Sequence, residues 1–91
     1  MRLIRTESFK RDFQALPEPI KRRTEQALRF FVANPRHPSL RAKKMEGQRD
    51  SEGRDIWEAR ITQAYRFTFV IDQDIYIFRR VGPHEDALRK P

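Results

Sequence analysis

Hydrophobic residues near the start of the chain recur with the period of a helix. Phe9, Phe13 and Leu16 are spaced i, i+4 and i+7, which places them on one face. Thr6 precedes them in the position of an N-cap, and Pro17 ends the stretch. The pattern predicts a helix between these two residues, preceded by a short strand over residues 1–5.

A second helix is predicted between two further prolines. Pro19 suits the first turn of a helix, and Asn34 followed by Pro35 ends the pattern. The short corner between the two stretches predicts a helix hairpin whose apolar face belongs to the core. The apolar residues that keep the helical period in this second stretch are Ile20, Ala27, Leu28, Phe31 and Val32.

The second half of the chain alternates between apolar and polar residues, as strands do. Three strands are predicted, over residues 56–61, 65–71 and 75–81, with residues 72–74 as a polar hairpin turn. The alternation predicts that one face of this sheet is covered and that the other is free. The face expected to be covered carries Trp57, Ala59, Ile61, Tyr65, Phe67, Phe69 and Ile71.

Residues 35–54 follow neither period. They hold two prolines, two glycines and several basic residues, so a loop is predicted, with at most a short strand near residues 40–45. After the last strand, Gly82 and Pro83 break the pattern and His84 begins a short polar tail. These elements predict an α+β fold in one domain over residues 1–91. An N-terminal strand and a helix hairpin would pack on one face of a small twisted antiparallel sheet.

Charge and composition narrow the class of protein. The chain has 91 residues with 20 Lys and Arg against 13 Asp and Glu, a net charge of +7, and the excess lies before residue 55. Such a balance favours a polyanionic partner. Ten aromatic residues argue against a disordered tail, and no apolar stretch approaches the ~20 residues of a membrane span. Without a leader-like segment after Arg2, a cytoplasmic protein is expected.

Several kinds of catalytic site are absent from the sequence. There is no cysteine, which removes thiolate catalysis, disulfides and Cys-ligated zinc. His37 lies between prolines, and the only other histidine is His84. Asp72 and Asp74 flank a single residue where a turn favours Asp. No metal site and no cofactor are therefore predicted.

A cationic site can cleave RNA when the 2′-hydroxyl of the substrate is the nucleophile. The protein must then stabilise the phosphorane and protonate the departing 5′-oxygen. Arg60 and Arg66, on neighbouring strands, suit the first task because a guanidinium matches phosphate oxygens. His84 suits the second, and Glu58 is a candidate base or a partner for an arginine. Solvated Arg–Glu pairs and a surface histidine are the alternative interpretation.

The sequence resembles the RelE/ParE superfamily of toxins from type II toxin–antitoxin pairs, in particular its RelE, YafQ and YoeB branch. The likeness is sharpest in IWEARITQAYRFTFVI, from Ile56, and in IFRRVGPHEDALR, from Ile77. It implies a ribosome-dependent mRNA endonuclease, or mRNA interferase, that inhibits translation. The implied partners are an acidic antitoxin, mRNA on the ribosome and ribosomal RNA.

The resemblance also assigns residues. Arg66 lies in the Tyr-Arg pattern in which such toxins place a phosphate-stabilising arginine, Arg60 lies where YafQ-like members have a histidine, and His84 follows Val-Gly-x. The basic residues expected to bind RNA are Lys43, Lys44, Arg49 and Arg80. The chain departs from RelE-like members because Trp57, Glu58 and Ala59 stand where those have lysines, and Leu88 stands near where several have Tyr or Phe.

Two other functions remain open from the sequence. The ParE branch has the same fold but inhibits DNA gyrase by binding, without cutting RNA. A third possibility is a non-toxic basic module whose free sheet face binds a partner. The histidine at position 84 favours the nuclease branch over the ParE branch.

Overall fold

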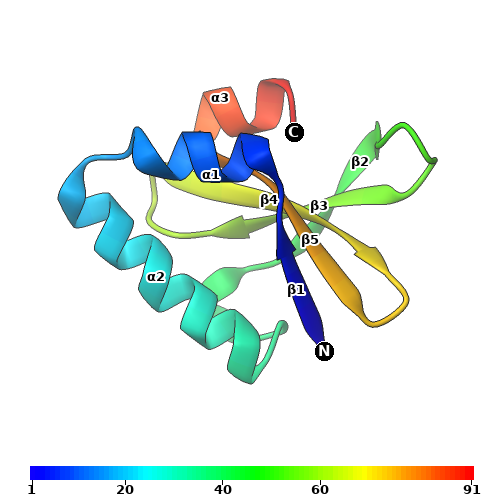
Figure 1. The fold of residues 1–91 in the computed structure, drawn as a ribbon, viewed down its shortest axis with the longest axis horizontal. Coiled ribbons are helices and arrows are strands. Elements are labelled where there is room, and N and C mark those ends of the chain that lie inside the picture. The colour runs from blue at the N-terminus through cyan, green and yellow to red at the C-terminus, as the bar shows by residue number, and fades with distance from the viewer.

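The chain forms a five-stranded sheet in the order β1-β5-β4-β3-β2, in a computed structural model that describes residues 1–91 (Figure 1). Neighbouring strands pair antiparallel, except that β1 runs parallel to β5. The predicted α+β class is confirmed, and the β1–β5 pair makes the sheet mixed rather than wholly antiparallel. The strands are β1 (Arg2–Arg5), β2 (Lys43–Arg49), β3 (Asp55–Arg60), β4 (Tyr65–Asp72) and β5 (Ile75–Pro83).

Both predicted helices are present, as α1 (Glu7–Gln14) and α2 (Glu18–Ala33). The Thr6 hydroxyl accepts the N–H of Phe9 at 3.2 Å and donates to the Phe78 carbonyl at 2.9 Å, so it caps α1 and fixes it to β5. The two helices diverge from the corner at Pro17 (Figure 1). No helix is long and apolar enough to cross a bilayer.

The hydrophobic core lies between α1, α2 and the face of the sheet that they cover, called the core face here. Phe31 of α2 is fully buried at its centre. Its ring meets four aromatic rings edge-on at centroid distances of 5.0 to 5.9 Å, those of Phe67, Phe69, Tyr76 and Phe78. The alternation predicted for β3 and β4 is confirmed, because Ala59, Ile61, Phe67 and Phe69 all belong to this cluster.

The opposite face of the sheet, called the outer face, is not free as predicted. The expected polar tail is a helix, α3 (His84–Arg89), which packs against β4 and β5 and buries Ala87. Pro91 is buried as well, and its carbonyl accepts the Thr68 hydroxyl at 3.0 Å. Val70 and Ile56, at 0% and 2% exposure, are apolar residues of this face. Apolar residues at these positions are buried only if another element packs over them. Their presence in the sequence was therefore the signal that this face is not free.

The predicted loop over residues 35–54 contains a full strand, β2, at the edge of the sheet. Its register with β3 shifts between Lys44 and Arg49, and Gly47 has a φ of +74°. This irregularity removes the alternation by which a strand is recognised. The segment before β2 contains a short 3-10 helix, η1 (Pro38–Leu40), which buries Leu40.

A network of ion pairs closes the turn between β2 and β3. Asp50 is 1% exposed and accepts the N–H groups of Glu52 and Arg54 at 3.0 and 2.8 Å. The Arg54 guanidinium also donates to Asp50 at 2.6 Å, to Glu52 at 2.9 Å and to Asp72 at 3.3 Å. Burial acts to raise the pKa of Asp50, but these donors outweigh it and hold that pKa below its ordinary value.

Acid is expected to weaken this turn. Because the pKa of Asp50 is lower in the folded chain, its contribution to stability is complete above its ordinary pKa of about 4. The contribution is lost as the pH falls through the folded value. Asp50→Asn should therefore be less stable than the wild type at neutral pH, and the difference should shrink in acid. Urea unfolding from pH 7 to 2.5 measures this, and a constant difference would contradict it.

Candidate functional site

Strand register brings three of the predicted site residues to one end of the sheet. Arg60 of β3 pairs with Arg66 of β4, and Arg66 pairs with Gly82 of β5. His84 follows two residues later and begins α3, where its N–H donates to the Ala64 carbonyl at 2.7 Å. This end of the sheet, carrying Arg60, Arg66 and His84, is called the cationic corner.

Arg66 is held firmly within the cationic corner. Its side chain is 16% exposed, and its Nη1 donates to the carbonyls of Thr62, Gln63 and Tyr65 at 2.5 to 3.0 Å. Burial lowers the pKa of Arg66, while the charge of Glu58 opposes that shift. The Nη2 group has no hydrogen bond within the chain. Arg66 therefore supports the β3–β4 turn and still has one donor for an anion.

Glu58 lies beneath this arginine on the outer face. Its side chain is 9% exposed, and its Oε1 is 3.7 Å from Nε of Arg66. Between the two roles that the sequence left open, a base or a partner of an arginine, the contacts favour the second. A carboxylate in this position offsets part of the positive charge that Arg66 brings to a partly buried place.

His84 is the most accessible residue of the cationic corner. It is exposed at the first position of α3, and its imidazole makes no hydrogen bond within the chain. Glu85 and Asp86 follow it in the first turn of that helix. A histidine without a structural partner has both ring nitrogens available to a ligand.

The residues of β2 that were expected to bind RNA lie exposed on the edge strand, with β3 between them and Arg66. Lys44 and Arg49 both face Asp55, with N–O distances of 3.8 and 3.6 Å. Lys43 pairs in register with Glu58. Exposed ion pairs of this kind contribute little to stability, so these cations remain available to a polyanion.

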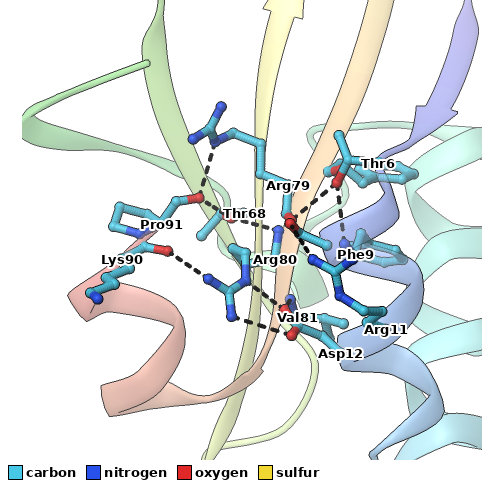
Figure 2. Close-up of polar contacts among 12 residues, drawn as sticks. Thr6, Phe9, Arg11, Asp12, Thr68, Arg79, Arg80, Val81, Lys90 and Pro91 are labelled. Carbon is cyan, nitrogen blue, oxygen red and sulfur yellow. Dashed lines mark hydrogen bonds and ion pairs between the residues drawn. The ribbon is translucent and has the colours of Figure 1, made fainter. Parts of the chain in front are cut away.

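Arg80 has a structural partner instead. Its guanidinium donates to the Asp12 carboxylate at 2.7 and 3.2 Å, and Asp12 also accepts the N–H of Val81 at 3.1 Å (Figure 2). Strand β1 pairs with β5 only as far as Phe78. Beyond that residue, the Asp12 carboxylate of α1 accepts a backbone N–H group on the unpaired edge of β5. Arg80 therefore links α1 to β5.

A bulge places Arg79 on the outer face, where it was not predicted to belong to a site. The register of β4 with β5 shifts between Thr68 and Phe69, so Arg79 is the extra residue. Its Nε donates to the Pro91 carbonyl at 3.0 Å (Figure 2). A groove of about 490 Å3 beside it is lined by further basic residues that the sequence did not single out, Arg89 and Lys90. Two consecutive arginines within an alternating strand were the available signal for this bulge.

The structure brings together no group of three or more His, Cys, Asp or Glu side chains that would hold a metal ion. The corner's chemistry consists of guanidinium groups, one buried carboxylate and one exposed imidazole.

Comparison with known families decides which group of proteins has these features. Residues 3–88 match the family described as the ParE toxin of type II toxin–antitoxin systems, parDE. The chain belongs to the ParE toxin family. This ParE-family chain has no significant match among curated proteins.

Solved structures share its fold. The RelE–RelB complex of Pyrococcus horikoshii contains a chain of 20% identity with a TM-score of 0.69, covering 90% of this chain and 92% of the other. The toxin chain of the RelB–RelE complex of Methanococcus jannaschii has 21% identity and a TM-score of 0.72, covering 94% of this chain and 95% of the other. The matching chain of the DinJ–YafQ complex of E. coli has 11% identity and a TM-score of 0.73, covering 94% of this chain and 97% of the other. At these identities the likeness shows the fold of the ParE-family chain, a RelE-like fold.

Proposed function

We propose that this chain is the toxin of a type II toxin–antitoxin pair, one cytoplasmic domain over residues 1–91, and that it cuts mRNA on the ribosome. The observation that carries the proposal is the exposed, unpartnered imidazole of His84 in the cationic corner with Arg60 and Arg66. The likeness in fold to RelE and YafQ toxins supports it.

The proposed reaction is an internal transesterification of RNA. The 2′-oxygen forms a bond to phosphorus, the bond from phosphorus to the 5′-oxygen breaks, and a 2′,3′-cyclic phosphate is left. His84 donates a proton to the departing 5′-oxygen, and the proton of the 2′-hydroxyl passes to solvent. No cofactor is needed, because the substrate supplies the nucleophile.

The two arginines stabilise the charge that develops on the phosphorane. Arg66 offers Nη2, and its other contacts fix the direction of that group before the substrate arrives. Arg60, half-buried and without an acidic partner, adds a second cation. In this mechanism Glu58 positions Arg66 and does not itself take a proton.

The proposed toxin also needs partners. RelB and DinJ are bound to relatives with the same fold, so a cognate antitoxin is proposed for this chain. The exposed cations of β2, Lys43, Lys44 and Arg49, are proposed to contact ribosomal RNA. A net charge of +7 favours an acidic protein and RNA alike.

Cleavage mapping tests the proposal. The toxin is induced in growing cells, and the 5′ ends of a reporter mRNA are mapped by primer extension. New ends inside the translated region are expected, and they should disappear when the start codon is removed, because cutting depends on translation. Intact transcripts in arrested cells would contradict the nuclease proposal.

Two observations favour the gyrase-binding alternative. The family match is to the ParE toxin, and three carbonyls occupy Nη1 of Arg66, so that only Nη2 is left for a phosphate. That function predicts DNA damage and inhibited gyrase with intact mRNA. The same induced culture distinguishes the two, when gyrase supercoiling is assayed beside primer extension. Normal growth with neither effect would favour a non-toxic basic module.

A further inference from the structure

A second cationic site lies beyond the cationic corner, around the end of the sheet towards α2. It is a pocket of about 510 Å3, lined by Arg23 of α2, Arg41 after η1 and Arg60 of β3. None of the three arginines has a carboxylate within 4.0 Å, and no acidic residue lines the pocket. Three cations from three elements therefore face one pocket with no internal counterion.

The backbone at Arg41 gives an independent reason to expect a ligand. Arg41 has a φ of +45° and a ψ of +44°, the left-handed conformation that favours Gly or Asn. Its side chain is exposed, so burial in the core does not explain why an arginine stands there. A cation held in an unfavourable conformation at the rim of an acid-free pocket indicates that its charge is used.

The charges crowd one another across this part of the molecule. After burial and the opposing charge of Glu58, the nearby guanidinium groups of Arg60 and Arg41 also lower the pKa of Arg66. Repulsion of this kind is relieved when an anion binds between the cations. Because Arg60 lines the pocket and also belongs to the cationic corner, the two sites are continuous.

The lining favours a phosphodiester backbone over an acidic peptide. The pocket's apolar floor consists of Ala27, Leu40 and Ile61, which are buried, and of Phe30, which is half-buried and already stacks on the ring of His37. A peptide partner is usually anchored by apolar or aromatic side chains, and this floor offers them little contact. The polar side chains are the kind that contact phosphate and sugar, namely Gln26, Ser39, Thr62 and Gln63.

We propose that the pocket of Arg23, Arg41 and Arg60 binds the phosphodiester backbone of single-stranded RNA next to the segment in the cationic corner. The choice of RNA rests on the proposed function, whereas the preference for an anion does not. Arg23 and Arg41 hold the neighbouring RNA in position, whereas Arg60, which the pocket shares with the cationic corner, also faces the phosphorane.

Arg41→Gly tests the site without endangering the fold. Glycine adopts a positive φ freely, so the variant should lose no thermal stability while it loses the charge. The probe is a short fluorescein-labelled single-stranded RNA, titrated by anisotropy at several salt concentrations without ribosomes. We expect the dissociation constant to rise about three- to ten-fold and the slope against log salt to fall by about 0.7, the value for one lost phosphate contact.

Matched variants on α2 separate a site from net charge. Arg23→Ala should weaken RNA binding as Arg41→Gly does, whereas Arg29→Ala should not. Arg29 is exposed on the same helix, lies outside this pocket and costs the same charge when it is replaced. Equal losses in the pocket and control variants would overturn the proposal, because diffuse charge would then explain binding.

A second probe separates RNA from an acidic protein segment. If Arg41→Gly leaves RNA binding unchanged but weakens binding of an oligoglutamate peptide of matched charge, the RNA assignment is overturned. The binding assay contains no ribosomes, so absent mRNA cleavage in cells would remove the proposed function and leave this result standing. If the Arg23, Arg29 and Arg41 variants all bind RNA as tightly as the wild type while mRNA is still cut in cells, the pocket proposal fails and the proposed function stands.

Discussion

Replacing His84 by alanine is expected to slow mRNA cleavage by about 100- to 10,000-fold, the usual contribution of a general acid. The imidazole is exposed at the start of α3 and makes no hydrogen bond within the chain. Its loss therefore removes the proton donor for the 5′-oxygen and little else. The rate is measured in a reconstituted translation system, with single-turnover cleavage of a programmed mRNA.

Two controls make that result specific. Stability should change by no more than about 0.5 kcal/mol, because the substitution is on the surface and breaks no hydrogen bond or ion pair. His84→Gln should be as slow as His84→Ala, since an amide retains polarity but does not act as a general acid. Unchanged cleavage by both variants would refute the role of His84. Toxicity that persists with inhibited gyrase would favour the ParE-type alternative.

Replacing Phe31 by alanine is expected to cost about 3–5 kcal/mol of unfolding free energy. Its ring is fully buried and is in edge-to-face contact with four other aromatic rings from β4 and β5. The loss is a large share of the stability of a small domain, about 5–15 kcal/mol. Urea denaturation followed by Trp57 fluorescence measures it.

The adjacent residue provides a matched control for the core. Phe30 is only half-buried and stacks on His37 at a centroid distance of 4.5 Å, outside the aromatic cluster. Phe30→Ala removes the same atoms from the same helix and should cost clearly less. Equal losses at the two positions would show that the cluster around Phe31 is not the centre of the core.

The sequence predicted the parts of the fold in which local pattern and burial agree. The apolar spacing from Phe9 and the cap at Thr6 specify α1, and the alternation through Phe67 and Phe69 specifies the core face. The turn at residues 72–74 was also readable, and Gln73 there has a φ of +58°. In each case neighbouring residues supply the whole signal.

The missed elements depend on distant parts of the chain. The strand β2 is irregular at Gly47 and takes its structure from pairing with β3. The helix α3 has few apolar residues, and it forms where Ile56 and Val70 need a cover on the outer face. Local patterns do not report such pairing, so the segment before residue 55 and the tail were misread.

The sequence predicted where the residues of the candidate site lie better than it predicted their hydrogen bonds and ion pairs. The sequence predicted Arg60 and Arg66 on one face of neighbouring strands, and the register makes them direct cross-strand partners. It did not show that Arg66 donates to a turn, that Arg80 binds Asp12 or that Arg41 lines an acid-free pocket. These features depend on where loops and helices meet, and on the bulge at Arg79.

The parallel strand β1 affects the order in which the protein is built. The Thr6 hydroxyl and its acceptor, the Phe78 carbonyl, are 72 residues apart, yet they lie side by side. During translation the first strand emerges long before its only neighbour, so its edge stays unsatisfied until β5 has been made. Strand β1, the first to be made, therefore joins the sheet only once β5 is in place.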